Sequence, residues 1–431
     1  MSPEIIGVIG LVILIALLFA RMWIGAAMAL VGFLGYAAIR GFDSAFGVVS
    51  QIPFSTVADY PLIAVPLFIF MGVIIFRSGV GTDLYETAYK NVGQLRGGLA
   101  MATVLACALF AAITGVSGPA IVTMGKVALP EMRRYNYDDK LATGSIACAG
   151  TLAFLIPPSV AFIIYGILTQ NSIGKLFMAG FIPGILLASL FVLTIVIITA
   201  RNPKAGPAGP KTSFREKVVS LKGTWPTVLL FILVLGGIYR GIFTPTEAGA
   251  VGAFGAIVIT TAYRRLNFRK FLDSLLEAGQ TTAFVFLLII GAFILMKFLA
   301  ISKLPFLLGD TIAGLPVPPM VIFAAIVLLY IILGMFLDII SAVILTIPII
   351  YPLVLSLGFD PIWFGVIVVI VIEMGLVTPP VGLDVFILSG AVDVPLFTIF
   401  RGVLPFLVAM IICIVLLIAF PQIALWLPGT M

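Results

Sequence analysis

Long apolar stretches follow one another along almost the whole chain, separated by short polar segments. Fourteen of them can be recognised, near 4–20, 22–39, 61–76, 98–113, 116–130, 141–168, 176–200, 225–243, 246–263, 281–300, 319–336, 339–357, 361–391 and 395–420. A helix needs about 20 apolar residues to cross a bilayer, and several of these stretches reach that length. The pattern therefore predicts an all-α polytopic membrane protein.

Composition narrows the class of protein further. The set AVILMFWYC makes up 62% of the 431 residues, and Asp, Glu, Lys and Arg together make up only 10%. Soluble globular chains hold about 25% charged residues, so a soluble enzyme, a disordered chain and a disulfide scaffold are excluded. The chain has no His, which rules out His-based triads, His metal sites and imidazole proton relays. We therefore expect a protein of the lipid bilayer that is not an enzyme, needs no organic cofactor and binds no nucleic acid.

One hydrophilic insert, 201–222, divides the chain into a first membrane repeat, 1–200, and a second one, 223–431. It contains six Lys or Arg residues, one Glu and a Pro/Gly-rich run, which indicates a basic cytoplasmic linker. Arg21 follows the first apolar stretch, which is therefore interpreted as a retained helix with its C-terminal end in the cytoplasm. The apolar positions of 267–280 predict an amphipathic helix that lies along the membrane surface.

The two parts of the chain match each other at a constant offset of 222 residues. The matched positions are a Pro-Pro pair and several single Pro, Gly and Asp residues. They comprise Pro130 and Pro352, Asp138 and Asp360, Pro157-Pro158 and Pro379-Pro380, Gly180 and Gly402, and Pro183 and Pro405. An ungapped register that contains a double-Pro pair indicates an internal repeat.

The charges of equivalent loops indicate how the two copies are oriented. The loop 131–140 carries Arg133, Arg134 and Lys140, whereas its counterpart 353–362 carries no Lys or Arg. Lys and Arg accumulate on the cytoplasmic side, so the two loops are expected on opposite sides of the membrane. The charge pattern thus predicts two inverted-topology repeats, which are typical of secondary transporters.

When crossings are counted from the cytoplasmic linker, the loops fall on these sides only if the segments near 98–130 and 319–352 are re-entrant helical hairpins. Each hairpin enters the membrane and returns to the side from which it came. Each hairpin is followed by a discontinuous helix, near 141–168 in the first repeat and near 361–391 in the second. With the four hairpin arms removed, about ten apolar stretches remain to cross the bilayer.

Four polar or Pro-rich breaks fall inside these apolar segments, at the hairpin turns 111–119 and 334–341 and at the interruptions 149–159 and 373–382. Irregular backbone is tolerated in a membrane only where it is buried in protein or lines an aqueous cavity. Proline lacks an N–H, so each Pro-Pro frees helix carbonyls that suit Na⁺, and helix N-termini suit an anionic substrate. The paired breaks predict an ion and substrate site; kinks stabilised by neighbouring helices are the alternative.

Three acidic residues stand beside these breaks. An ionisable group at mid-membrane costs about 2.5–3.5 kcal/mol on insertion scales, so it normally faces protein or water. Asp338, at the second hairpin turn, is interpreted as a cation ligand or orienting group, or else as the cap of the following helix. Glu373 and Asp384 flank the second break as proton-sensing or structural hydrogen-bonding groups. Lys126 is expected to reach the cytoplasmic surface, with attraction of the anion as the alternative.

Long motifs in both halves resemble one family of transporters, the DctM-type large membrane subunit of tripartite ATP-independent periplasmic (TRAP) transporters. The second half carries FLDIISAVILTIPIIYP (336–352), GFDPIWFG (358–365) and GLVTPPVGLDVF (375–386). LIPPSVAFIIYG (155–166), SIGKLFMAGFIPGILL (172–187) and TPTEAGAVGA (244–253) extend the resemblance over nearly the whole chain.

This resemblance implies a partner-dependent function. Such a permease pairs with a small DctQ-type membrane subunit and receives its substrate from a periplasmic DctP-type binding protein. The family moves small organic anions, such as C4-dicarboxylates or sugar acids, by Na⁺ symport with an elevator-type motion. The expected location is a bacterial inner membrane, and Na⁺ is the transported coupling ion.

Carried over residue by residue, the resemblance places two Na⁺ sites and a substrate site. The first Na⁺ site would comprise Thr114, Gly115, Ser117, Gly150 and Pro157, and the second Gly334, Asp338, Thr378 and Pro379. The substrate would contact Ser117, Gly118, Ser159, Asp338, Gly382 and Asp384. Two features depart from the family pattern: the first turn reads TGVSGPA, not a serine-rich stretch, and Glu373 and Asp384 stand where Asn is expected in many relatives.

Three alternatives stay open at this point. A single-component ion-coupled carrier would also use paired hairpins but would transport without a binding protein. A channel would give ohmic currents without a gradient of a second solute. A membrane enzyme has no support from a nucleophile motif or a metal-ligand cluster in the sequence.

Overall fold

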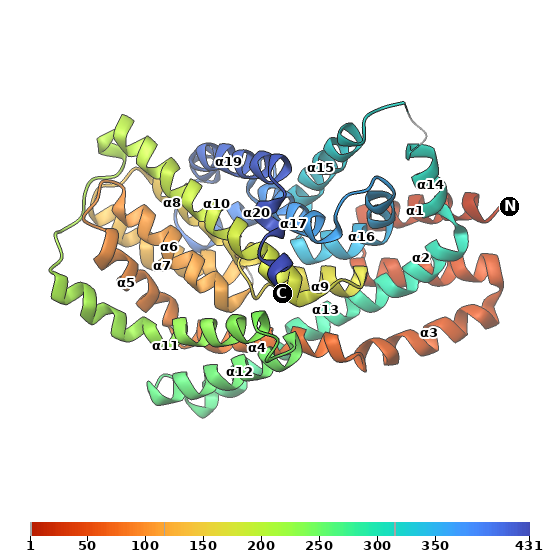
Figure 1. Ribbon diagram of the computed structural model, residues 1–431, viewed down its shortest axis with the longest axis horizontal. Coiled ribbons are helices and arrows are strands. Elements are labelled where there is room, and N and C mark those ends of the chain that lie inside the picture. The colour runs from red at the N-terminus through yellow and green to blue at the C-terminus, as the bar shows by residue number, and fades with distance from the viewer. Residues whose placement is uncertain (1, 116, 314–315) are drawn as a thin grey trace.

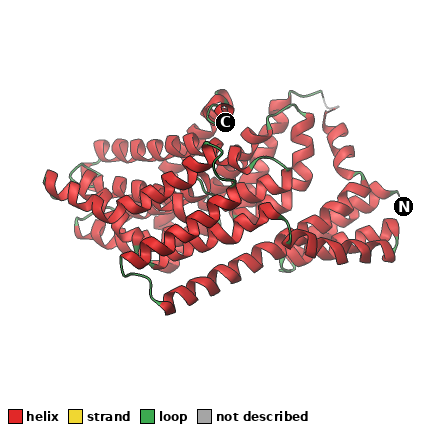
Figure 2. Ribbon diagram, turned by 60° about the horizontal axis from the view of Figure 1, so that its bottom comes forward, coloured by secondary structure: helices red, strands yellow, loops and turns green. Residues whose placement is uncertain are grey.

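The computed structural model describes residues 2–115, 117–313 and 316–431, apart from the side chains of 111–114, 306, 308, 310, 312 and 313. All regular structure in these ranges is helical, and no strand occurs there (Figure 1, Figure 2). The prediction of an all-α chain is therefore confirmed.

The first half of the chain forms ten α-helices and one short 3₁₀ helix. They are α1 (Pro3–Phe19), α2 (Ile24–Arg40), α3 (Phe42–Val57), η1 (Tyr60–Ile63), α4 (Ala64–Arg77), α5 (Val80–Val92), α6 (Gly98–Thr114), α7 (Ser117–Arg134), α8 (Asp139–Leu155), α9 (Val160–Thr169) and α10 (Ile173–Arg201).

The second half begins after the short helix η2 (Pro203–Ala205). It contains α11 (Phe214–Tyr239), α12 (Pro245–Ala262), α13 (Phe268–Ser302), α14 (Leu304–Ala313), α15 (Pro319–Phe336), α16 (Ile339–Ser356), α17 (Pro361–Val377), α18 (Leu383–Ala391), α19 (Leu396–Ala419), α20 (Gln422–Leu425) and η3 (Pro428–Thr430).

Within the described ranges, eight segments are long and apolar enough to cross a membrane, judged by length and composition. They include both arms of the second hairpin, Pro319–Phe336 and Ile339–Ser356, and they count Asp139–Thr169 as one segment. Shorter apolar helices, such as α1, α2 and α17, accompany them. The chain is thus a multi-pass membrane protein.

The interpretation of 267–280 as a separate surface helix is wrong. Helix α13 runs without a break from Phe268 to Ser302, over 35 residues, which corresponds to about 50 Å at 1.5 Å per residue. The apolar positions Phe271, Leu272 and Leu275 lead directly into the apolar stretch that follows, and no Pro or helix cap separates the two segments. The sequence pattern also missed α3 and α5, whose polar residues place them outside the fourteen apolar stretches.

The hairpin arms and broken helices occupy the middle of the molecule. Helices α6 and α7 approach from one end of the elongated molecule, and α15 and α16 approach from the other (Figure 1). Helix α6 packs against α8, and α15 packs against α17. A second layer is built around the long helix α13, which packs against α2 and α4, while α12 packs against α4.

Each hairpin also reaches the broken helix of the other half. Helix α7 packs against α18, and α16 packs against α9. Two hydrogen bonds add to the second contact region: Asn171 Nδ2 donates to Tyr351 Oη at 2.9 Å, and Tyr165 Oη donates to the carbonyl of Pro361 at 2.6 Å. The two halves therefore build one shared centre.

Equivalent Asp residues start the two broken helices. Asp138 precedes α8 and its carboxylate accepts from the N–H of Lys140, and Asp360 precedes α17 and accepts from the N–H groups of Ile362 and Trp363. A side-chain acceptor at this position satisfies N–H groups that have no partner inside the helix. The same local signal, at the same place in both halves, explains why both helices begin where they do.

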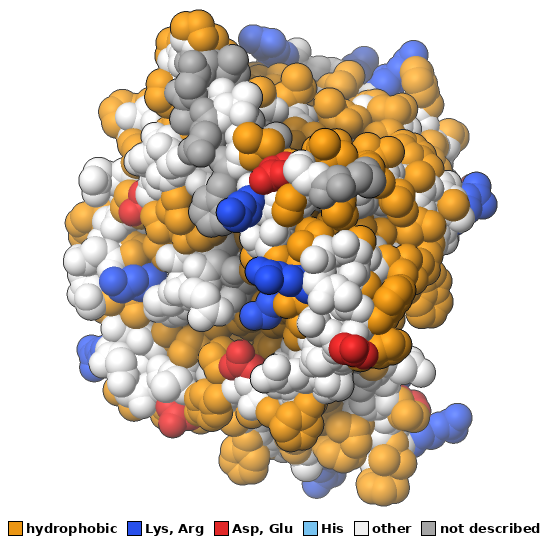
Figure 3. Space-filling view, turned by 90° about the vertical axis from the view of Figure 1, so that its right-hand side faces the viewer, with side chains coloured by type: hydrophobic (Ala, Val, Ile, Leu, Met, Phe, Trp, Pro, Cys, Tyr) orange, Lys and Arg blue, Asp and Glu red, His pale blue; other side chains and the backbone are white. Residues whose placement is uncertain are grey.

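The outer surface is largely apolar. On the face at the N-terminal end of the molecule, hydrophobic side chains gather mainly on the right-hand side and at the bottom of the view, with Lys, Arg, Asp and Glu scattered over the face (Figure 3). Helices α1 and α3 contribute Val12, Phe42 and Phe54, which are each more than half exposed. Such exposure is unfavourable in water but suits contact with lipid chains.

Candidate functional site

Each of the two broken helices is interrupted at a Pro-Pro pair. Helix α8 ends at Leu155 and α9 begins at Val160, and helix α17 ends at Val377 and α18 begins at Leu383. Because proline has no N–H, the carbonyls of residues 153 and 154 in the first helix and of 375 and 376 in the second lose the helical bond from four residues onward. The carbonyl of Gly375 accepts from the N–H of Thr378 at 3.0 Å in its place. Both breaks thus leave carbonyl oxygens available to a ligand.

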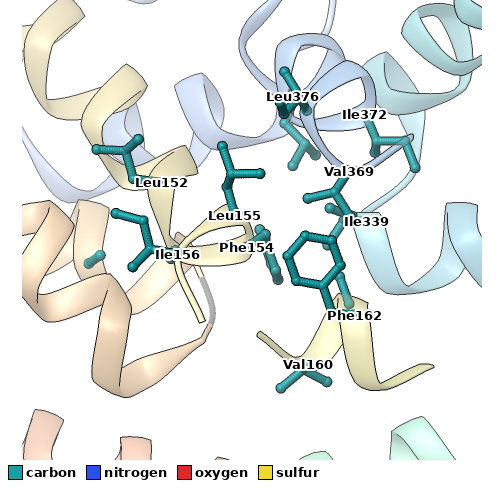
Figure 4. Packing of buried hydrophobic residues seen from close by; sticks show 14 of the residues in the cluster. Leu152, Phe154, Leu155, Ile156, Val160, Phe162, Ile339, Val369, Ile372 and Leu376 are labelled. Atoms are coloured by element: carbon teal, nitrogen blue, oxygen red, sulfur yellow. The ribbon is translucent and has the colours of Figure 1, made fainter. Parts of the chain in front are cut away.

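The first break is completely enclosed. Pro157, Pro158 and Ser159 are buried, as is every residue of α9. Apolar side chains of the broken helix and of two other helices surround it. Figure 4 shows Leu155 of α8, Ile156 directly after α8, Phe162 of α9, Ile339 of α16 and Ile372 of α17 around this centre. Ser159 caps α9 by accepting from the N–H of Phe162 at 3.4 Å.

The first hairpin turn lies directly against this break. Gly115 has a φ of +61°, and a Cβ atom there would lie 2.7 Å from the carbonyl oxygen of Pro158. Only glycine allows both this backbone conformation and this close approach. The carbonyl that follows the Pro-Pro pair therefore faces the hairpin tip. Thr114 ends α6, and its side chain lies outside the described residues.

Gly150 lies on α8, about two turns before Pro157, and faces α7, the second arm of the first hairpin. A Cβ atom on Gly150 would lie 2.2 Å from Cγ1 of Ile121 on α7. Such a contact cannot exist, so the absence of a side chain at Gly150 permits α7 and α8 to pack closely. Of the residues assigned to the first Na⁺ site, Gly115 and Pro157 lie at the break, and Gly150 lines the helix contact beside it.

The predicted substrate residues Ser117 and Asp384 are brought together from opposite halves. Ser117, in the first turn of α7, donates to Oδ1 of Asp384 in the first turn of α18 at 3.0 Å. Ser117 is 5% exposed and Asp384 1%. A Cβ atom on Gly118 would also lie 3.9 Å from Cδ1 of Ile387 on α18. The first hairpin tip thus contacts α9 and α18 at once.

The second hairpin turn lies against α17. A Cβ atom on Gly334 would lie 2.5 Å from the carbonyl oxygen of Ile372, and one on Gly375 would lie 2.7 Å from Cα of Gly334. Asp338 caps α16, because its Oδ1 accepts from the N–H of Ser341 at 3.1 Å and its Oδ2 accepts from Ser341 Oγ at 2.5 Å. Of the two roles weighed for Asp338, the capping role is therefore present in the structure.

The second break is more open than the first. Thr378 and Pro379 are half-buried and Pro380 is exposed. Thr378 Oγ1 donates to the carbonyl of Met374 at 2.5 Å. Gly382 has a φ of +60°, and a Cβ atom there would lie 3.2 Å from the carbonyl oxygen of Thr378 and 3.4 Å from that of Leu376. Two carbonyl oxygens therefore converge on Gly382.

Glu373 is a buried acid that the predicted site residues left out. It is fully buried on α17, and neither carboxylate oxygen has a hydrogen-bond partner among the described residues. Oδ2 of Asp384 also lacks a partner among them, and the two carboxyl groups interact electrostatically. The signal in the sequence was an acidic residue within a long apolar helix, which is costly without a compensating partner.

The cations near these elements lie away from the breaks. Lys126 is exposed on α7. Arg133, at the end of the same helix, bonds to both carboxylate oxygens of Asp139 at 3.0 Å and to the carbonyl of Asp393 at 3.1 Å. Arg77, on α4, pairs with Glu277 of α13 at 2.7 Å.

These features define a class of protein. Two helical hairpins, each with its tip against a Pro-Pro break in a buried helix, build one central region from both halves of a membrane protein. Broken helices that meet near the middle of such a fold are typical of secondary transporters.

Comparison with known proteins identifies the family. Residues 11–423 match the family "Tripartite ATP-independent periplasmic transporter, DctM component", and the chain belongs to this family. It is 36% identical, over 87% of its length and 88% of the relative, to the C4-dicarboxylate TRAP transporter large permease protein DctM of Pseudomonas aeruginosa. It is also 33% identical to the sialic acid TRAP transporter large permease protein SiaM of Vibrio cholerae, over 96% of each chain.

These relatives are named as transporter permeases, so the expectation that the chain is not an enzyme is confirmed. A solved structure, that of the YdaH transporter of Alcanivorax borkumensis, has the same fold. Its TM-score is 0.66, over 89% of this chain and 90% of that one, at 15% sequence identity. The likeness shows the architecture alone.

Proposed function

We propose that this chain is the large permease subunit of a binding-protein-dependent transporter that imports an organic anion by Na⁺ symport. The observation that carries the proposal is the contact of the first hairpin tip with both halves: Gly115 lies against Pro158, and Ser117 bonds to Asp384. A solute at such a tip is released only when the tip moves. The relatives' names specify C4-dicarboxylate, sialic acid and isethionate, which is a sulfonate, so the proposed substrate class is a small organic anion such as a carboxylate.

The chemistry of the breaks suits Na⁺ as the coupling ion. Carbonyl and hydroxyl oxygens are the ligands that hard cations prefer, and unwound helix backbone supplies them in transporters. At the second break the carbonyls of Leu376 and Thr378 face Gly382, and Thr378 Oγ1 still has free lone pairs. At the first break the carbonyl of Pro158 faces Gly115. Two Na⁺ ions, one at each break, follow from this proposal.

The proposed partners are a small DctQ-type membrane subunit and a periplasmic DctP-type binding protein. A relative that is 33% identical, the isethionate TRAP transporter permease protein DctMQ of Oleidesulfovibrio alaskensis, bears a name that joins the two membrane components. The chain covers 70% of that relative. A system of this kind operates at a bacterial inner membrane.

An elevator-type motion is the proposed conformational step. The hairpins and broken helices form the moving part, and the helices around α13 form the part that stays in place. The two breaks support this proposal because they differ in exposure within one structure, the first being enclosed and the second half-open. When the hairpins and broken helices move as one body past the helices around α13, the side of the centre that is covered would change.

Reconstitution tests the proposed function. The chain, with its small subunit, is placed in proteoliposomes, and uptake of a labelled carboxylate is measured with and without binding protein and an inward Na⁺ gradient. Uptake that needs both supports the proposal. Uptake without binding protein favours a single-component carrier, and ohmic current without a Na⁺ gradient favours a channel.

Two variants test the second Na⁺ site. Thr378→Ala and Asp338→Ala should each raise the Na⁺ concentration for half-maximal uptake by about tenfold, because a positioned oxygen or its support is lost. Asp43→Ala removes an exposed carboxylate from the first turn of α3 and serves as the matched control. If both site variants transport like the control at limiting Na⁺, the second site is misplaced.

A further inference from the structure

The linker between the halves is attached to the first half at several points. The sequence predicts a basic cytoplasmic linker, and in the structure Ala205 and Gly206 of this linker are buried. The N–H of Gly97 donates to the carbonyl of Gly206 at 2.8 Å, and the N–H of Asp138 donates to that of Ala205 at 3.0 Å. Further along, the N–H of Gly209 donates to the carbonyl of Gly93 at 2.9 Å. We call residues 202–213 the strap.

Glycine allows the strap to lie this close. A Cβ atom on Gly206 would lie 3.1 Å from Cα of Gly97, and one on Gly209 would lie 2.7 Å from the carbonyl oxygen of Gly93. Either methyl group would force the strap away from the chain beneath it. The glycines of this Pro/Gly-rich segment therefore allow its backbone to lie against the first half, and the segment also spans the distance between the two halves.

Side chains continue the attachment beyond the backbone bonds. Thr212 Oγ1 donates to the carbonyl of Lys90 at 2.6 Å, and Thr87 Oγ1 donates to the carbonyl of Ser220 at 2.9 Å. Lys90, whose carbonyl accepts the first bond, and Thr87, whose hydroxyl donates the second, both belong to α5. Helix α5 is therefore joined to the end of the strap and to α11.

The strap connects the elements that form the base of the first hairpin. It begins at the end of α10, passes the start of α6 and the start of α8, and follows the end of α5 to reach α11. In Figure 1 it runs along the outer edge of the molecule, on the side where α5, α6 and α7 lie. The hairpin tip at Gly115 lies at the opposite end of α6, in the centre of the molecule.

We propose that the strap is a clamp that holds the base of the first hairpin against α5 and α8, so that only the tip moves when the hairpin opens. This rests on the proposed transport function. A hairpin with a free base can swing as a whole, which would move the base and the tip together. With the start of α6 bound to the strap through Gly97, and the start of α8 through Asp138, the movement is confined to the region around Gly115 and Ser117.

Hydrogen exchange of the full chain in lipid nanodiscs tests the clamp without any transport assay. Peptides that contain Gly97, Asp138 and Gly209 should exchange slowly both with and without Na⁺. Gly209→Ala should speed exchange in 93–98 and 205–210 by about tenfold, because the strap is displaced. Lys211→Ala, at an exposed strap position, is the matched control and should exchange like the unmodified chain. Exchange of these amides at the rate of a free linker in the unmodified chain would overturn the clamp.

Uptake by the same variants tests its role. Gly209→Ala should lower the rate of carboxylate uptake several-fold, while the Na⁺ concentration for half-maximal uptake stays unchanged. Thr212→Val removes one side-chain bond and should give a smaller loss, which keeps the test valid if Gly209→Ala fails to fold. Normal uptake by variants whose strap exchanges faster would overturn the role of the clamp. If the unmodified chain shows no uptake, the proposed function fails, and the exchange data still decide whether the strap is held.

Discussion

The two Pro-Pro breaks occupy equivalent positions in the sequence but differ in their surroundings. The first, at Pro157-Pro158, is enclosed by apolar side chains of both halves, whereas Pro380 in the second is exposed. The same Pro-Pro motif thus lies in two different environments, because different neighbouring helices cover each broken helix. The difference teaches that the repeat specifies where the helices break, and that packing decides which break a solute can reach.

The contacts of the hairpins differ in the same way. At the offset of 222, Ser117 and Asp384 of the α7–α18 contact correspond to Ile339 and Phe162 of the α16–α9 contact. The first pair is joined by a hydrogen bond at 3.0 Å, whereas both members of the second belong to the apolar core. One side of the centre is polar and the other is apolar, so a cation would find oxygen partners mainly on the side of Asp384.

The largest effect is expected when the acidic residue of the polar contact, Asp384, is introduced at the equivalent position of the apolar contact, Phe162. Phe162→Asp places a carboxylate in a fully buried position without a cationic partner. An unpaired buried charge and the loss of a core phenyl ring should together destabilise the protein by at least about 3–5 kcal/mol. Thermal unfolding in detergent measures the loss, with Phe162→Leu as the control. A folded Phe162→Asp variant with an unchanged melting temperature would show that the first break is not enclosed.

A smaller effect is expected at the glycine contact of the second half. Gly334→Ala introduces a methyl group that would lie 2.5 Å from the carbonyl of Ile372, and overpacking of this kind costs about 1–3 kcal/mol. Gly279→Ala is the control, because a Cβ atom there meets nothing within 4 Å. Equal melting temperatures for the two variants would mean that α15 and α17 are not in close contact.

Thiol labelling compares the exposure of the two breaks directly. Ser159 and Val381 are equivalent at the offset of 222, and Ser159 is fully buried whereas Val381 is half-buried. Val381→Cys should react with a water-soluble maleimide about tenfold faster than Ser159→Cys, which corresponds to about 1.4 kcal/mol in the free energy of access. Cys107, Cys148 and Cys413 are buried and supply little background. Equal rates would contradict the difference between the breaks.

The smallest effect is expected at the surface beside the first hairpin. Asp139→Asn removes the ion pair with Arg133, at 3.0 Å, and its counterpart positions in the second half, Leu355 and Pro361, carry no charge. Both partners are substantially exposed, so the loss should be only about 0.2–1 kcal/mol. The same thermal assay measures it, and a shift as large as that of Gly334→Ala would mean that this tie between α7 and α8 is stronger than an ordinary surface pair.

The positions of the helix breaks could be predicted from the sequence because their signals are local. Pro-Pro pairs interrupt helices wherever they occur, since the missing N–H groups are a property of the residue itself. Asp338 and Ser159 were assigned to the centre from short motifs, and the structure places both as helix caps at the breaks. The prediction of a separate surface helix at 267–280 was wrong. The apolar face of this segment continues into the next apolar stretch and no stop signal separates them, so the two form one helix.

By itself the sequence determined the membrane class, the all-α architecture, the family and the positions of the breaks, because hydrophobic length, proline and family motifs act over short stretches of chain. Only the tertiary structure decided that Ser117 bonds to Asp384 across 267 residues, that Glu373 is fully buried, and that the strap lies on the base of the first hairpin. These features depend on which helices meet, and that is set by the packing of surfaces contributed from both halves.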